Sequence, residues 1–117
     1  MNPTLRKPLI AGNWKMFKTV REAVETAREL VQLTASVNVD VMIAPPFTAL
    51  APVADVVKGT SVALGAQNLF WKNEGAYTGE ISPVMLSDIG CKYAIIGHSE
   101  RRQFFGAVGS RLVAARS

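Results

Sequence analysis

One short apolar segment ends in residues that can take part in acid–base chemistry. Tyr93–Ile96 is too short for a helix and rich in strand-forming residue types. Gly97 breaks it, and His98, Ser99 and Glu100 follow at once; His98 is the only histidine in the chain. A buried strand that ends here places a titratable ring at the carboxyl end of a sheet, where α/β barrels and open sheets carry their chemistry. His98 is therefore a candidate catalytic residue, and the alternative is a histidine that only satisfies a hydrogen bond.

The elements that must position this histidine form an alternating pattern. Near-continuous apolar runs predict strands at residues 8–13, 39–44, 61–66 and 92–96, and helical patterns lie between them. Strands of this kind that alternate with helices imply a parallel sheet in sequential order, with helices on one face.

Cap residues indicate where the helices begin and end. Thr19 and Glu22 fit a capping box before an amphipathic helix. Thr48 is expected to cap a helix over residues 49–57, and Ser82 followed by proline starts a third helix that ends at Gly90.

Two segments lack a clear period. Residues 67–81 form a long irregular loop, and such loops are usually functional or disordered. Its aromatic residues argue against disorder. Residues 110–116 are expected to add one or two helical turns, with no fifth strand. One domain over residues 1–117 accounts for the whole pattern.

Composition excludes several classes of protein. The 117 residues are 49% hydrophobic and 19% charged, which indicates a globular domain. The net charge of +4 is mild, and no basic stripe with interleaved aromatics suggests nucleic-acid binding. Cys91 is the only cysteine, so it excludes an internal disulfide and is read as a small buried hydrophobe in a reducing compartment. With no signal peptide or bilayer-spanning stretch apparent, we expect a cytoplasmic protein without membrane partners.

Five motifs carry a resemblance to a known family. They are Ala11-Gly12-Asn13-Trp14-Lys15-Met16, Ala44-Pro45-Pro46-Phe47, Gly65-Ala66-Gln67-Asn68, Gly75-Ala76-Tyr77-Thr78-Gly79-Glu80-Ile81-Ser82 and Ile96-Gly97-His98-Ser99-Glu100-Arg101-Arg102. In this order and spacing, the sequence resembles triosephosphate isomerase. The resemblance implies an eight-fold (β/α) barrel, of which this chain covers the first four βα units as a half barrel. The segment after Phe105 and Gly106 departs from the expected acidic helix start.

The resemblance also implies the chemistry. The family interconverts dihydroxyacetone phosphate and glyceraldehyde 3-phosphate with a glutamate base and a neutral histidine electrophile. On this pattern His98 polarises the carbonyl, and a helical turn from Ser99 would favour its neutral form. Lys15 supplies a cation to the enediolate and phosphate, Asn13 orients Lys15 and binds substrate, and Glu100 pairs with Lys15. The resemblance implies no metal and no cofactor.

Each of these assignments has a plainer alternative. A lysine is usually a solvated surface group, and Glu100 beside two arginines could be only a charged turn. The family's glutamate base and later phosphate-binding loops fall outside the part that this chain resembles. We therefore expect the chain alone to have little or no activity. The alternatives are a half-enzyme completed by a C-terminal half, or a non-catalytic fragment that self-associates; an open sheet of another function ranks third.

Self-association is expected on two grounds. A half barrel would expose the inner side chains of its strands, at residues 9–11, 41–43, 62–64 and 94–96, and would leave two unpaired edges at the first and fourth strands. The resemblance also implies that the 67–81 loop reaches into a neighbouring subunit. Its expected interface residues are Phe70, Trp71, Tyr77, Thr78, Gly79 and Glu80.

Overall fold

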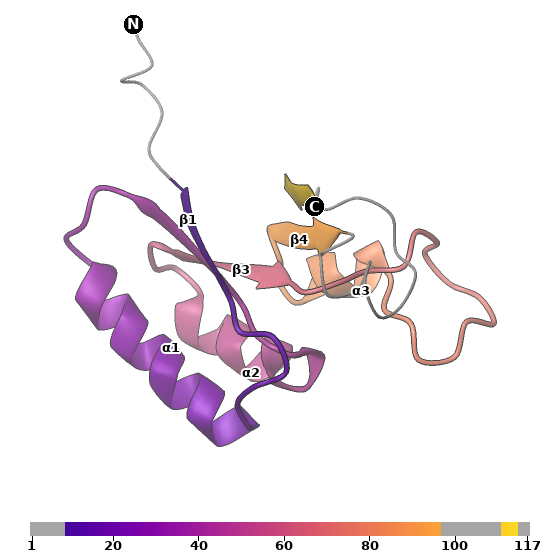
Figure 1. The fold of residues 1–117 in the computed structure, drawn as a ribbon, viewed down its shortest axis with the longest axis horizontal. Helices are drawn as coiled ribbons and strands as arrows, with labels where there is room; N and C mark the ends of the chain where they lie inside the picture. The colour runs from indigo at the N-terminus through magenta and orange to yellow at the C-terminus, as the bar shows by residue number, and fades with distance from the viewer. Residues whose placement is uncertain (1–8, 97–110, 115–117) are drawn as a thin grey trace, which may run out of the picture.

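The structure is a computed structural model, and it describes residues 9–96 together with the backbone of residues 111–114. Strands and helices alternate along the chain as far as its fourth strand (Figure 1). In order they are β1 (Leu9–Asn13), α1 (Val20–Thr34), β2 (Asp40–Ala44), α2 (Phe47–Val57), β3 (Val62–Ala66), α3 (Pro83–Asp88), β4 (Tyr93–Ile96) and β5 (Arg111–Ala114).

The first four strands form a parallel sheet in sequential order, as predicted. The register pairs Ala11 with Met42 and Met42 with Ala63, so these residues lie side by side across three strands. Each strand begins within one residue of its predicted start. Their near-continuous apolar runs form buried parallel strands because helices cover the sheet. The four strands make a half barrel wall.

The prediction for the C-terminal segment was wrong. Instead of helical turns, residues 111–114 form β5, which pairs antiparallel with β4 from Tyr93↔Ala114 to Ile96↔Arg111. A helix of one or two turns is marginal by itself, whereas the edge of β4 offers a row of unpaired backbone groups. The fourth strand is therefore not an open edge, contrary to expectation.

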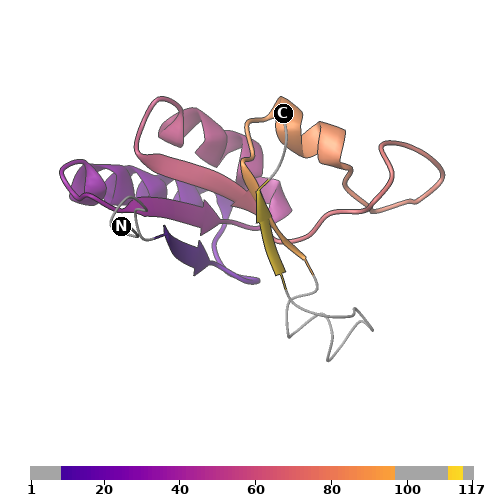
Figure 2. The same ribbon diagram turned by 90° about the horizontal axis from the view of Figure 1, so that it is seen from above.

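Helices α1 and α2 lie on the same side of the sheet, as the view in Figure 2 shows. They pack against each other, and α2 also packs on β3. Buried residues from the three helices, from the outward faces of the strands and from the segment before β4 form one core: Ala23, Ala27, Val41, Ile43, Ala49, Leu50, Val53, Val57, Val62, Leu64, Ala66, Leu86, Cys91 and Ala94. The expected helices on one face are thus confirmed for α1 and α2.

The opposite, inner face is less exposed than expected. Met42, Ala44 and Ile95 form a second buried cluster, against which Ala63 and Tyr93 pack. Met42 is fully buried because its side chain crosses the space over Gly65: a Cβ placed there would lie 2.5 Å from the Met42 sulfur. Of the strand residues that were predicted to be exposed on the inner face, those on β1 and Ile96 are exposed.

Side-chain caps explain where α1 and α3 begin, but α2 begins without one. Thr19 and Glu22 form the predicted capping box, and Ser82 accepts from the Met85 N–H with proline at the first helical position. Helix α2 instead begins at Phe47 with Pro46 as its N-cap and no side-chain cap, so the predicted role of Thr48 was wrong. The chain turns into this helix at the rigid prolines, two residues before the predicted start.

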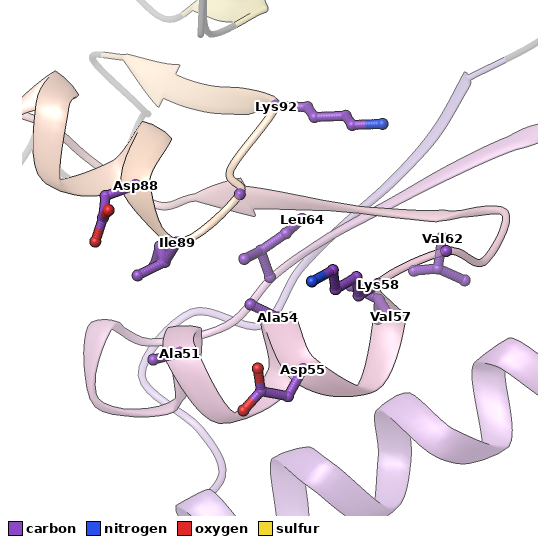
Figure 3. A pocket seen from close by; sticks show the side chains of 12 residues that line it. Ala51, Ala54, Asp55, Val57, Lys58, Val62, Leu64, Asp88, Ile89 and Lys92 are labelled. Atoms are coloured by element: carbon purple, nitrogen blue, oxygen red, sulfur yellow. The ribbon is translucent and has the colours of Figure 1, made fainter.

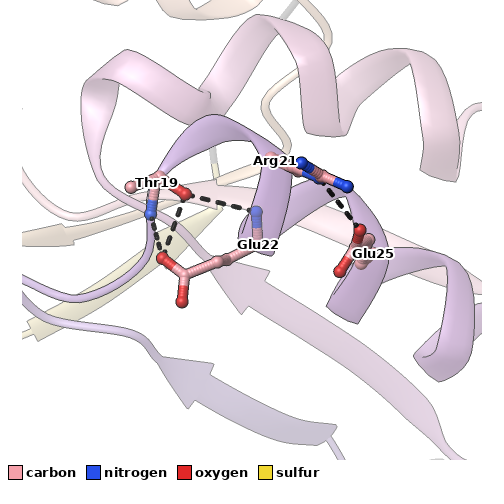
Figure 4. A network of polar contacts seen from close by, with 4 residues as sticks. All are labelled: Thr19, Arg21, Glu22 and Glu25. Atoms are coloured by element: carbon pink, nitrogen blue, oxygen red, sulfur yellow. Dashed lines mark hydrogen bonds and ion pairs between the residues drawn. The ribbon is translucent and has the colours of Figure 1, made fainter.

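The capping box of α1 makes its stability depend on pH. The Glu22 carboxylate accepts from the Thr19 N–H and the Thr19 hydroxyl, both at 3.0 Å (Figure 4). The Thr19 backbone hydrogen bond, followed by the side-chain bond, lowers the pKa of Glu22 below its ordinary value of 4.5. A lowered pKa stabilises the fold above the unfolded value, and the contribution is lost as pH falls through the folded value.

Replacing Glu22 by glutamine should therefore remove a pH-dependent part of the stability. We expect the free energy of unfolding of the wild type to exceed that of Glu22→Gln at neutral pH, and the difference to shrink as pH falls below about 4.5. Urea titrations at a series of pH values measure this. A difference that stays constant between about pH 7 and pH 3 would contradict the assignment.

Candidate active site

Asn13 and Lys15 lie at the carboxyl end of β1. Barrels carry their active sites at the carboxyl ends of their strands. The Lys15 backbone N–H donates to Oδ1 of Asn13 at 2.9 Å. Lys15 has a φ of 53°, in the left-handed region that non-glycine residues adopt at some cost. The short asparagine side chain stabilises this local turn by accepting the amide that the strand no longer uses. The backbone conformation of Lys15 is thus held by its neighbour.

Gln67 ties this turn to the rest of the sheet. Its Nε2 donates to the carbonyl of Lys15 at 2.7 Å and to the carbonyl of Ala44 at 2.9 Å. Gln67 directly follows β3, and Ala44 ends β2, so one side chain joins the carboxyl ends of three neighbouring strands. Both amide protons are used, which fixes the orientation of the side chain. The turn that carries Lys15 is therefore anchored from outside its own segment.

Gln67 was missed as a site residue. It lies in the motif Gly65-Ala66-Gln67-Asn68, but its type and position alone did not show which carbonyls it reaches. The available signal was a long amide side chain directly after a strand, at the edge where Asn13 and Lys15 were expected.

Trp14 completes the anchoring of the same turn. Its backbone N–H donates to the Ala44 carbonyl at 3.1 Å and extends the β1–β2 ladder by one residue. Its ring lies 5.5 Å from the ammonium group of Lys18, a cation–π contact. The backbone of Lys15 is thus fixed on both sides while the residue itself is exposed. A cation so placed can stabilise negative charge that develops on a bound molecule.

The structure brings together only part of the predicted constellation. Asn13 and Lys15 are adjacent and joined by a hydrogen bond. His98 and Glu100 lie outside the described residues, although β4, which leads to them, ends on the same side of the sheet as β1. In the described part of the chain, no three His, Cys, Asp or Glu side chains are grouped to hold a metal ion.

The loop over residues 67–81 is held by an aromatic cluster. The rings of Phe70 and Tyr77 have centroids 4.4 Å apart, and the ammonium of Lys72 lies 4.7 Å from the Trp71 ring. Backbone bonds close the base of the loop, including one from Phe70 to Ile81 at 2.7 Å. Trp71 remains 75% exposed, and Thr78, Gly79 and Glu80 are also exposed. The loop is therefore folded on itself and presents an aromatic surface to the outside.

One hollow in the described part of the chain lies away from these residues. It has a volume of about 550 Å³ and opens between α2, the turn after α3 and the start of β3 (Figure 3). Lys58, Val62 and Lys92 line it, so it sits at the amino ends of the strands, opposite the edge that carries Lys15. In barrels that face serves stability rather than chemistry.

Cys91 is buried, as predicted for a small hydrophobe. Burial raises the pKa of its thiol to about 11, so the sulfur stays protonated and unreactive near neutral pH. No helix among the described residues is long and apolar enough to cross a membrane.

Four parallel strands in sequential order, covered by helices and with Asn13, Lys15 and Gln67 at the carboxyl ends of β1 and β3, define part of a (β/α)8 barrel. The sequence model of the triosephosphate isomerase family matches residues 8–115. The chain therefore belongs to the triosephosphate isomerase family.

Individual relatives agree. Triosephosphate isomerase from Caldanaerobacter subterraneus subsp. tengcongensis is 58% identical over 101 residues, which cover 86% of this chain and 41% of that protein. The enzyme from Moorella thermoacetica is 49% identical over 115 residues, or 95% of this chain and 46% of that protein. The crystal structure of the Bartonella henselae enzyme matches with a TM-score of 0.80 and 38% identity, covering 86% of this chain and 42% of that one. The chain thus spans less than half the length of these relatives.

Proposed function

We propose that this chain supplies the first half of a triosephosphate isomerase site. That site interconverts dihydroxyacetone phosphate and glyceraldehyde 3-phosphate through an enediolate, in glycolysis and gluconeogenesis. In the proposal His98 polarises the carbonyl oxygens, Lys15 neutralises charge on the enediolate and the phosphate, and Asn13 binds substrate beside it. Glu100 pairs with Lys15 and holds its amine in place.

The anchored turn at Lys15 is the observation that carries this proposal. A catalytic cation must be held in place before charge develops, because reorganisation during the reaction would cancel its benefit. Asn13 and Gln67 hold the backbone of Lys15 by hydrogen bonds of 2.9 and 2.7 Å, in a conformation that costs energy. Backbone strain that the surroundings maintain is typical of functional sites.

In the same proposal the isolated chain has little or no isomerase activity. The match covers about 41% of the relatives' length, and the family's glutamate base falls outside the region of resemblance. Without a positioned base, proton transfer loses about 10²–10⁴ in rate. A coupled assay of purified chain with dihydroxyacetone phosphate tests this.

Contamination by a host isomerase is the main source of error in that assay. Lys15→Ala, purified in parallel, is the control: activity that survives this substitution does not belong to the chain. A Lys15-dependent turnover near that of ordinary enzymes, about 10 per second, would contradict the proposal.

A second candidate function is self-association without catalysis. Several large apolar side chains are exposed, among them Leu9, Ile10, Met16, Phe17 and Trp71. Contiguous apolar surface drives association. The aromatic loop over residues 67–81 is the proposed second contact in a homo-oligomer, with Thr78 near the partner subunit's Asn13 and the partner subunit's Lys15. We place the protein in the cytoplasm, with a small phosphorylated triose and copies of itself as partners, and no cofactor.

A further inference from the structure

The two backbone groups of Lys15 are held by side chains from different parts of the chain. Its N–H donates to Oδ1 of Asn13 at 2.9 Å, and its carbonyl accepts from Nε2 of Gln67 at 2.7 Å. The first bond joins residues two apart, so it can form in more than one local backbone conformation. The second bond fixes the direction of the carbonyl from a different strand, and this direction depends on the sheet rather than on the turn.

Gln67 has a rigid support from which it can impose that direction. It follows Ala66, which ends β3 and is fully buried. Its other amide proton goes to the carbonyl of Ala44 at 2.9 Å, and Ala44 is fully buried as well. The two N–H bonds of an amide lie in one plane, so the bond to Ala44 fixes where the remaining proton points. The carbonyl of Lys15 has to come to that proton.

We propose that Gln67 is the positioning residue that imposes the left-handed backbone conformation on Lys15. The φ of 53° is disfavoured for any residue with a Cβ, so it needs an external cause. Water could satisfy the exposed carbonyl equally well, but it would impose no direction. Without Gln67 we expect Lys15 to relax to a negative φ, which redirects the side chain that carries the amine. The importance of this direction for catalysis rests on the proposed function; the effect on the backbone does not.

Glycine and alanine substitutions at this position report the sign of φ. Lys15→Gly and Lys15→Ala both remove the amine, so the difference between them comes from the backbone. A positive φ favours glycine, and a negative φ favours alanine. With Gln67 in place, we expect the folded-to-unfolded equilibrium constant of Lys15→Gly to be about threefold larger than that of Lys15→Ala. In a Gln67→Met background the order should reverse, again by about threefold.

Lys18 provides the matched control within the same segment. Its φ of 79° is also left-handed, whereas the two hydrogen bonds from Gln67 go to Lys15 and Ala44. Lys18→Gly should therefore remain more stable than Lys18→Ala in both backgrounds. If the order did not reverse at Lys15, or if it reversed at both positions, the proposal would be overturned. Circular dichroism shows whether Gln67→Met is folded; if it is not, Gln67→Glu, which keeps the shape and loses the donors, takes its place.

Nuclear magnetic resonance gives a readout that needs no change at Lys15. A positive φ brings the amide and α protons of one residue closest together, so the nuclear Overhauser effect between them is strong. We expect a strong effect at Lys15 in the wild type and a weaker one in Gln67→Met, with Lys18 unchanged. A weak effect at Lys15 in the wild type, or an unchanged one in the variant, would contradict the proposal. None of these measurements uses isomerase activity, so this proposal and the proposed function can fail independently.

Discussion

A separately produced C-terminal half of the barrel, mixed with this chain, should give an isomerase rate at least about 10²–10⁴ above that of either half alone. The added half would bring the glutamate base to the edge where Asn13 and Lys15 lie. A base and an electrophile on opposite sides of one substrate act only when both are positioned, so the effect is more than additive. Rates measured across a titration of one half into the other give the effect and the affinity.

Cutting back a central core side chain should cost a large part of the stability. Leu64 on β3 is 2% exposed and packs in the cluster between the sheet and the helices. Leu64→Ala removes buried surface and leaves a cavity, and we expect a loss of about 2–5 kcal/mol. Domains of this kind are stabilised by about 5–15 kcal/mol in total, so the variant would be close to unfolding.

Urea denaturation followed by circular dichroism measures that loss. Leu33→Ala is the control, because the same atoms are removed from a side chain that is 72% exposed, and we expect a change within about 0.5 kcal/mol. If both variants lost the same amount, the described core would not be the one that stabilises the chain. At protein concentrations that favour a dimer, the comparison must be made at one fixed concentration.

Elements with local causes could be predicted from the sequence. The strands follow from apolar runs, and α1 and α3 follow from caps whose partners lie three residues away. β5 could not be predicted, because what makes it a strand is the open edge of β4, on a distant part of the chain. The burial of Met42 on the inner face was missed for a similar reason, since it depends on Gly65 in the neighbouring strand.

In the candidate site, too, contacts between residues close in sequence could be predicted, and contacts between distant residues could not. Asn13 and Lys15 were predicted from a motif, and their contact joins residues two apart in the sequence. Gln67 holds the same turn from a position 52 residues away, so the carbonyl that it reaches depends on how the strands pack side by side. The positions of His98 and Glu100 remain predictions, because both lie outside the described residues.

The most direct test of the central claim is the isomerase rate of the mixed halves with two lysine variants. Lys15 and Lys18 lie three residues apart between β1 and α1, and the ammonium group of Lys18 lies 5.5 Å from the Trp14 ring. We predict that Lys15→Ala lowers kcat/KM by about 10²–10³, as expected for the loss of one group that stabilises developing charge, while Lys18→Ala changes it by less than about threefold. Equal losses for the two variants, or an active mixture that does not need Lys15, would contradict the account.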